Sequence, residues 1–223
     1  MKRPPIGLRR TLEDSAERLK KAIQINSLSK LLIQFVFQPI FSPMAPTPRY
    51  IPNASKAMEV ILWIANASPG FDVYQLVKSA FFADKYHLSH YGRPISGDTY
   101  QAAPFGPLAT VVYNLLRRDP IEMIALKSNG DLPFEVDQRH KVRAAREANG
   151  RMLSGTDVEA LQFGVDHVKN RTFDDIYRET HDDPAYINAG GGPMDYRDFL
   201  DESDPDKVEK TSLIEETARY AIF

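Results

Sequence analysis

The sequence predicts a mainly α-helical fold of the α+β class that contains one small β-hairpin. Apolar residues recur at helical spacing in several segments, and a capping residue precedes most of them. Asn129-Gly130 lies between two apolar runs and is typical of a type I′ hairpin turn. Prolines concentrate in the stretch 39–52, and glycines together with prolines in the stretch 92–107, where helices and strands cannot easily continue.

Composition narrows the class of protein. The 223 residues are 43% hydrophobic and 26% charged, as in an ordinary globular domain with appendages. The absence of cysteine excludes disulfides, cysteine nucleophiles and zinc ribbons, and it fits a cytoplasmic localisation. No apolar run reaches the ~18–20 residues of a membrane span. The net charge of −2 gives no general attraction to nucleic acid.

The two ends of the chain differ in charge. Residues 1–30 carry eight basic and three acidic side chains, whereas residues 195–223 carry four basic and nine acidic ones. We expect a basic N-terminal helical extension over 1–38, a semi-rigid proline-rich linker over 39–52 and an acidic C-terminal helix over 201–223. Met44 is an alternative start, which leaves open whether residues 1–44 are translated.

The first part of the main domain reads as a helical hairpin. Asn53 or Ser55 caps a helix that runs to Ala67, and Asp72 caps a second helix that runs to about Ser89. Gly92 follows in the position after a helix where glycine is favoured. The stretch 94–105 is expected to be an extended loop, and Pro107 to open a third helix that ends near Arg118.

The second part alternates between short elements. We expect a strand over 121–127, a turn over 128–131 and a returning strand over 132–136, with 137–149 either helical or loop. Further helices are expected over 154–169 and 172–180, followed by a flexible connector over 184–193. Pro205 is expected to open the last helix.

Possible catalytic groups are few. Asp84, His87 and His90 lie three residues apart on the second helix and could offer metal ligands, but they lack the i, i+4 spacing of a zinc protease. His181 precedes two aspartates near the end of a helix, where a packing or dipole role is more common. There is no Gly-x-Ser-x-Gly elbow, and Gly190–Gly192 lacks the lysine of a phosphate loop. The basic run 139–151 is interrupted by acids and reads as a solvated face.

The segment 83–107 specifies a shape rather than a reaction. Three glycines and three prolines are interspersed with aromatic residues, which is typical of an ordered recognition loop. Its aromatic residues Tyr91, Tyr100 and Phe105 could belong either to the core or to an interface. The Asp98 carboxylate is expected to cap or turn this loop.

This segment resembles the signature of the Panacea domain, the SocA-like antitoxin family. The pattern ADKYHL, YGRPI, GD, Y, A and GP occurs at Ala83–Leu88, Tyr91–Ile95, Gly97-Asp98, Tyr100, Ala102 and Gly106-Pro107. A later family pattern matches the helix from Phe173, His181 and Pro184, with Tyr186 where a tryptophan is frequent. The resemblance covers roughly residues 53–200, and the acidic helix 201–223 follows it.

The resemblance implies a compact helical domain that acts as the antitoxin of a bacterial or phage toxin–antitoxin pair. Such a protein is not an enzyme and needs no cofactor or metal. Its partner would be a cognate toxin, or also a cellular protease if it delivers the toxin for degradation; a metal-dependent hydrolase is a weaker alternative. The residues expected to contact the partner are Tyr91, Arg93, Asp98, Tyr100 and Phe105. The residues expected to hold the motif's shape are Asp84, Lys85, Tyr86, Gly92, Pro94, Gly97, Gly106, Pro107 and His181.

Overall fold

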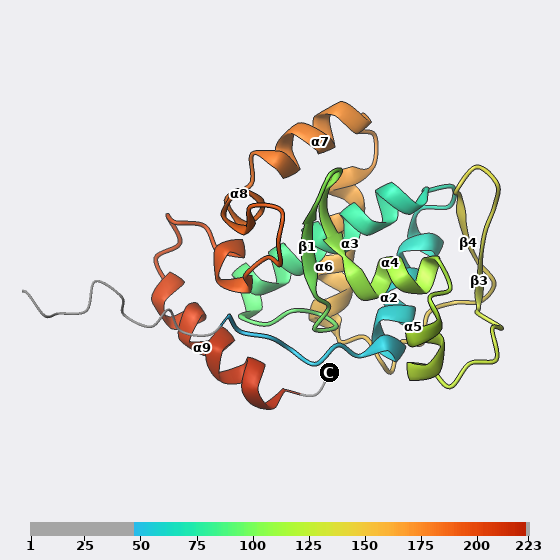
Figure 1. The fold of residues 1–223 in the computed structure, drawn as a ribbon, viewed down its shortest axis with the longest axis horizontal. Helices are drawn as coiled ribbons and strands as arrows, with labels where there is room; N and C mark the ends of the chain where they lie inside the picture. The colour runs from blue at the N-terminus through green and yellow to red at the C-terminus, as the bar shows by residue number, and fades with distance from the viewer. Residues whose placement is uncertain (1–46, 222–223) are drawn as a thin grey trace, which may run out of the picture. The chain divides into compact units, whose positions relative to one another are not determined.

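Helices dominate residues 47–221, which are the residues that the computed structural model describes (Figure 1). Two short antiparallel hairpins, β1–β2 and β3–β4, accompany them, so the predicted mainly helical class is confirmed. In chain order the elements are α2 (Ala54–Ala67), α3 (Val73–Tyr91), β1 (Tyr100–Ala103), β2 (Gly106–Ala109), α4 (Thr110–Leu116), α5 (Pro120–Ala125), β3 (Phe134–Val136), β4 (Val142–Ala144), α6 (Gly155–Val168), α7 (Phe173–His181), α8 (Pro184–Ala189), the 3₁₀ helix η1 (Tyr196–Phe199) and α9 (Lys207–Tyr220).

The α3–α6 pair forms the centre of the core. Phe81 and Leu88 of α3 are fully buried, as are Leu161 and neighbouring apolar residues of α6. Gly164 allows the two helices to approach closely, because a Cβ at this position would lie less than 3 Å from the Ser79 carbonyl oxygen. Helix α2 contacts both of these helices and α4, and it completes the apolar interior.

Four predicted helix starts are confirmed by their caps. Each capping side chain accepts a backbone N–H from the first turn, which satisfies one of the donors that a helix leaves free at this end. Three of the four also form reciprocal capping boxes. The caps are Asn53 for α2, Asp72 with Gln75 for α3, Ser154 with Asp157 for α6 and Thr172 with Asp175 for α7.

The prediction of a helix from Pro107 is wrong. Residues 106–109 form β2, which pairs with β1, and the helix α4 begins only at Thr110. Gly106 adopts φ +88°, which closes the tight turn after Phe105. Pro107 is tolerated because β2 is an outer strand, whereas β1 also bonds to the segment around Met194 on its other side.

The prediction of a hairpin at Asn129-Gly130 is also wrong. The stretch 121–127 belongs mostly to the helix α5, which Asp119 caps and Pro120 opens, and Ile121 and Ile124 are about three-quarters exposed. Only the last part of the predicted returning strand is a strand, β3, and its partner is β4. A proline after an aspartate was the local signal for this helix start.

The basic run after this hairpin contributes to the structure of the domain. Arg146 donates to both carboxylate oxygens of the buried Glu59, at 2.9 and 2.7 Å, and the Asn149 N–H donates to the same carboxylate at 2.7 Å. Hydrogen bonds from Arg146 hold the pKa of Glu59 below its usual range. The loop over 145–149 is therefore fastened to α2.

The expected flexible connector 184–193 instead contains the helix α8. Asp183 caps it, Pro184 opens it, and Gly190 ends it in the left-handed conformation. The following residues bond to β1, since the Ala102 N–H donates to the Gly192 carbonyl and the Met194 N–H to the Tyr100 carbonyl. The prediction of a flexible connector is wrong because Gly190 ends a helix and the Gly192 carbonyl is bonded to β1.

The ends of the described chain pack on the domain. Tyr50, within the predicted linker, is 3% exposed, and its hydroxyl hydrogen-bonds with Thr217 of α9 at 2.9 Å. Ile214 of α9 is fully buried. The predictions for 1–38 and most of the linker lie outside the described residues, and the predicted domain boundaries stay predictions. Between residues 47 and 221, no helix combines the length and apolarity needed to cross a membrane.

Candidate partner-binding surface

Most of the glycine- and proline-rich segment faces the interior. Asp98 is 1% exposed and Tyr100 is 3% exposed, so neither side chain is available to a partner in this structure. The same is true of Pro94, Gly97 and Pro107, which are buried. The expectation that Asp98 and Tyr100 act as surface contacts is therefore corrected by their burial.

Asp98 caps the helix α4. Its carboxylate accepts the N–H groups of Thr99, Val111 and Val112 at 2.6, 2.8 and 3.0 Å. Burial raises the pKa of Asp98 to about 7, against the opposing effect of these three donors. The Tyr196 hydroxyl donates to the Asp98 backbone carbonyl, which connects η1 to the residue that caps α4. The sequence predicts that the Asp98 carboxylate caps or turns the loop, and in the structure this carboxylate caps the helix α4.

Asp84 holds the loop against α3. Its carboxylate accepts the Ile95 N–H at 2.7 Å and the Tyr100 hydroxyl at 2.8 Å. Burial raises the pKa of Asp84, because the charged form loses its hydration. The neighbouring Lys85 forms an ion pair with Asp183 and so connects α3 to α8.

Arg93 belongs to a cluster centred on Asp157. The fully buried Asp157 carboxylate receives Arg93 at 3.1 Å, Lys56 at 2.9 Å and His87 at 3.3 Å. Burial alone would raise its pKa, but hydrogen bonds from His87, the Ser154 N–H and Lys56 outweigh burial and hold the pKa well below its usual range. This cluster joins α2, α3, the loop and α6, and Arg93 is only partly exposed.

Tyr91 and Tyr86 form a separate, partly exposed feature on α3. Both hydroxyls donate to the Glu159 carboxylate, at 2.8 and 2.7 Å, and the Tyr86 ring stacks on His90 and Phe163. These side chains lie on the α3–α6 side of the domain. Tyr91 therefore remains a predicted partner contact, but it lies apart from the exposed Phe105.

The structure does not bring the possible metal ligands together. Asp84 and His87 are buried and bonded to the loop and to α6, while His90 is exposed. His181 lies on α7, where its Nδ1 bonds to the Tyr177 carbonyl at 2.7 Å. Within residues 47–221 no group of three or more His, Asp or Glu side chains could hold a metal ion.

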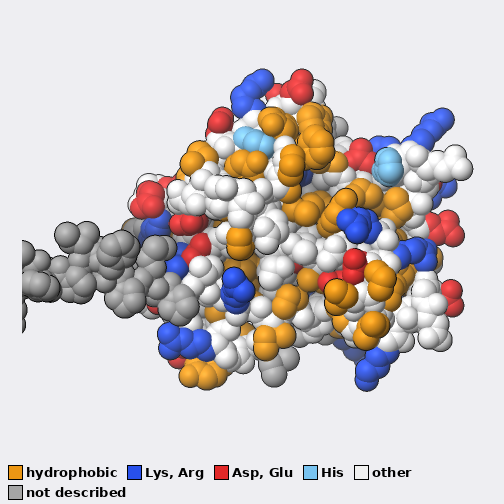
Figure 2. All heavy atoms as spheres, viewed as in Figure 1, with side chains coloured by type: hydrophobic (Ala, Val, Ile, Leu, Met, Phe, Trp, Pro, Cys, Tyr) orange, Lys and Arg blue, Asp and Glu red, His pale blue; other side chains and the backbone are white. Residues whose placement is uncertain are grey.

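A row of hydrophobic side chains, exposed or partly exposed, crosses the tip of the β1–β2 hairpin and the helix α7 (Figure 2). Phe105 is 64% exposed at the hairpin tip, and its ring meets that of Phe173, which is 48% exposed. Phe173 contacts Tyr177, which stacks on His181, and His181 contacts Tyr186. We call this row the aromatic ridge: Phe105, Phe173, Tyr177, His181 and Tyr186.

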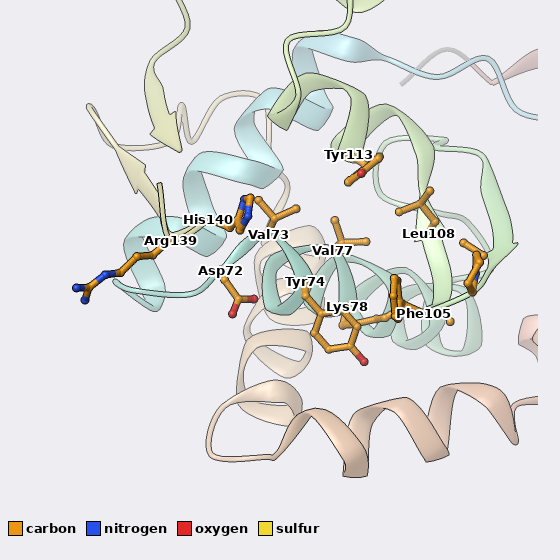
Figure 3. Close-up of a pocket in the computed structure, with 13 residues that line it drawn as sticks. Asp72, Val73, Tyr74, Val77, Lys78, Phe105, Leu108, Tyr113, Arg139 and His140 are labelled. Atoms are coloured by element: carbon orange, nitrogen blue, oxygen red, sulfur yellow. The ribbon is translucent and has the colours of Figure 1, made fainter. Parts of the chain in front are cut away.

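A groove of about 620 Å³ lies beside the ridge, and Phe105 belongs to both (Figure 3). Its walls come from the first turns of α3, the hairpin tip, the start of α4 and the loop around His140. The lining is mostly apolar. The buried Lys78 is one of its few polar groups, and its amine donates to the Pro107 carbonyl at 2.7 Å.

Gly106 makes room for this lysine. A Cβ at Gly106 would lie less than 3 Å from both the Lys78 amine and the Thr180 hydroxyl oxygen. The glycine of the family signature thus serves two purposes, a left-handed turn and space for a buried amine. Gly92 has a comparable role, because it ends α3 with φ +67° and lets Leu213 of α9 pack against the chain.

Sequence reasoning found Phe105 but missed the rest of the ridge as a surface. Phe173, Tyr177 and His181 follow one another at i, i+4 and i+8, so they share one face of α7. Ile176 and Thr180, each three residues after a ridge residue, lie on the adjacent side of the helix and are buried. This spacing was the available signal. The sequence around Lys78 does not indicate that this lysine is buried, because its burial depends on Gly106 and on α7, far along the chain.

The described residues form a mainly helical domain with aromatic side chains exposed on the hairpin tip and α7. A family model described as antitoxin SocA-like, Panacea domain, matches residues 76–186. The chain therefore contains a SocA-like Panacea domain, and this match includes the whole hairpin and α7. No curated protein and no solved structure matches the chain.

Proposed function

We propose that this protein is an antitoxin that neutralises a partner toxin by binding it through the aromatic ridge. The family match supports an antitoxin role, and the ridge is the observation that carries the choice of surface. Exposed aromatic clusters are typical of protein interfaces, where a few such side chains supply most of the binding energy. Neutralisation by binding needs no catalytic group, in keeping with the structural roles of Asp84, His87 and Asp98.

The ridge is suited to binding a toxin because contacts with the rest of the domain hold its rings in place. Phe105 extends from a two-residue turn between paired strands, and Phe173 packs on Tyr74 of α3 at 4.8 Å between ring centres. Rigid aromatic side chains lose little conformational entropy on binding. Burying a phenylalanine ring contributes about 1.5–3 kcal/mol, so the two ridge phenylalanines supply part of the energy that offsets the entropy cost of association.

The test is co-expression with the toxin encoded beside this gene, with growth and affinity measured together. Wild-type protein restores growth and forms a complex, whereas Phe173→Ala weakens binding at least tenfold and Phe105→Ala also weakens it. Phe163→Ala is the matched control, because Phe163 is similarly exposed but stacks on Tyr86 outside the ridge. Absence of a complex with wild-type protein would refute the function, and unchanged binding by both ridge variants would refute the surface.

Toxin lifetime separates two modes of neutralisation. Occlusion leaves the toxin's half-life unchanged or longer in the presence of this protein, whereas delivery to a protease shortens it. We favour occlusion, since the ridge offers a contact surface while nothing in residues 47–221 singles out a second site for a protease. The same proposal places the pair in the cytoplasm, which suits a chain without cysteine.

A further inference from the structure

Lys78 lines the groove and has no carboxylate partner among the residues that the structure describes. Its side chain is 98% buried, since only 2% of the residue is exposed, and the Pro107 carbonyl accepts one of its hydrogen bonds. An ammonium group has three donors, so two remain available. Burial lowers the pKa of Lys78 to about 7, and no nearby acid within residues 47–221 opposes this effect. A buried cation of this kind is expensive unless an anion accompanies it.

Tyr74 supplies a second unused donor in the same groove. Its hydroxyl is buried and has no hydrogen-bond partner among the described residues. Its ring lies beside Lys78, with 5.3 Å between the amine and the ring centre, and both residues line the groove in Figure 3. Buried hydroxyls are normally bonded, so an unpaired one beside an unpaired lysine points to an acceptor that both could serve.

The remaining lining indicates what would carry this acceptor. Val77, Leu108 and Tyr113 form apolar walls, and Phe105 joins the groove to the aromatic ridge. At the rim lie Arg139, His140 and Asp72. Asp72 already caps α3 and pairs with Lys141 at 3.5 Å, so the acid at the rim is neutralised from within the domain. The groove thus combines apolar walls with unmatched positive charge.

We propose that the groove binds an apolar segment of the partner toxin that carries a carboxylate, with Lys78 as its counter-ion and Tyr74 as a second donor. This inference rests on the proposed function. A protein segment is favoured because the groove opens onto the ridge that would meet the toxin, so one continuous partner surface can cover both. The carboxylate would come from an aspartate, a glutamate or the toxin's C-terminus.

The decisive variant is Lys78→Met. Methionine keeps an unbranched apolar stem of similar length and lacks the amine, so the groove nearly retains its shape and the fold loses a single hydrogen bond. We expect toxin affinity to fall at least tenfold for Lys78→Met and several-fold for Tyr74→Phe. Lys127→Met, an exposed lysine after α5, is the matched control and should bind within twofold of wild type. Circular dichroism verifies that each variant is folded.

A double-mutant cycle then identifies the partner group. One Asp→Asn or Glu→Gln change in the toxin, or amidation of its C-terminus, should lose the same affinity as Lys78→Met, and the combined change should cost little more. Equal toxin binding by wild type and Lys78→Met would overturn the groove proposal while leaving the antitoxin function in place. Failure of wild type to bind the toxin at all would instead remove the proposed function.

A small carboxylate serves as an independent probe. Octanoate and its uncharged analogue octanamide are titrated into the isolated protein and followed by NMR shifts of groove residues. We expect octanoate to bind more tightly than octanamide and to lose this advantage with Lys78→Met. Octanoate binding that depends on Lys78, together with unimpaired toxin binding by Lys78→Met, would assign the groove to a free carboxylate and overturn the proposal.

Discussion

At the scale of single residues, the buried charges of this domain act as internal fasteners. Asp84, Asp98 and Asp157 each accept hydrogen bonds from segments distant in sequence, and all three are almost fully buried. A buried carboxylate that lost these partners would face the full cost of desolvation. The recognisable motif residues therefore fix the loop's conformation from the inside.

The Asp98 cap can be tested by Asp98→Asn. The amide has one acceptor oxygen instead of two, so the N–H groups of Val111 and Val112 cannot both keep their bonds. We expect a loss of about 1–3 kcal/mol in the free energy of unfolding, measured by urea denaturation. Asp131→Asn, at an exposed loop position, should change it by less than about 0.5 kcal/mol. Equal stability of the two variants would contradict the capping role.

Lys78 makes stability depend on pH in a defined direction. Its pKa falls from 10.5 in the unfolded chain to about 7 in the folded protein, so the unfolded state binds the proton first as pH falls. The stability present above about pH 10.5 is thus lost as pH falls towards 7, by at most about 1.4 kcal/mol per pH unit. Lys78→Met should become more stable than wild type over this range, with the gap levelling off below pH 7.

Thermal unfolding of both proteins from pH 7 to 10 checks this expectation. Taking the difference between them removes the contribution of other groups, such as Asp98, whose raised pKa of about 7 acts at lower pH. A gap that does not change with pH would show that Lys78 keeps its proton in the folded protein. If Lys78→Met is more stable than wild type but binds the toxin more weakly, then Lys78 is retained for function at a cost in stability.

At the scale of elements, the crossing of α3 and α6 depends on one glycine. Gly164→Ala places a methyl group against the Ser79 carbonyl oxygen, which belongs to the backbone and cannot rotate away. We expect a loss of about 1–3 kcal/mol despite the better helix propensity of alanine. Gly155→Ala in the same helix places its methyl group in open space, so the free energy of unfolding should be unchanged or slightly higher. Scanning calorimetry of both variants measures the difference. A larger loss of stability for Gly155→Ala than for Gly164→Ala would contradict this account of how α3 and α6 cross.

Elements set by local chemistry were predictable from the sequence, whereas those set by tertiary contacts were not. The caps at Asp72, Ser154 and Thr172 act within one turn, so the sequence alone located them, and it narrowed the first cap to Asn53 or Ser55. The strand β2 could not be predicted locally, because it pairs with β1 across a turn, and β1 is held on its other side by a bridge between Gln101 and Pro193. Of the candidate site, Phe105 was foreseen, but its neighbours on α7 lie about 70 residues further along.

At the scale of the whole molecule, stability is concentrated on the α3–α6 side of the core. Helix α3 has eleven buried residues, α5 has none and α9 has only Ile214. Hydrogen exchange should therefore be slowest in the middle of α3 and α6 and much faster in α5, because amides under few buried contacts open locally. Mass-spectrometric exchange measures this directly, and equal protection of α5 and α3 would contradict it.

The burial of the signature motif has a consequence for engineering. Several residues of the recognisable pattern, among them Asp84, Asp98 and Tyr100, face inward, whereas the ridge residues Phe105, Phe173 and Tyr177 are substantially exposed. Much of the scaffold and the exposed part of the proposed contact surface thus depend on different residues of the sequence. A library randomised at these three positions could be selected against new toxins while the inward-facing letters stay constant.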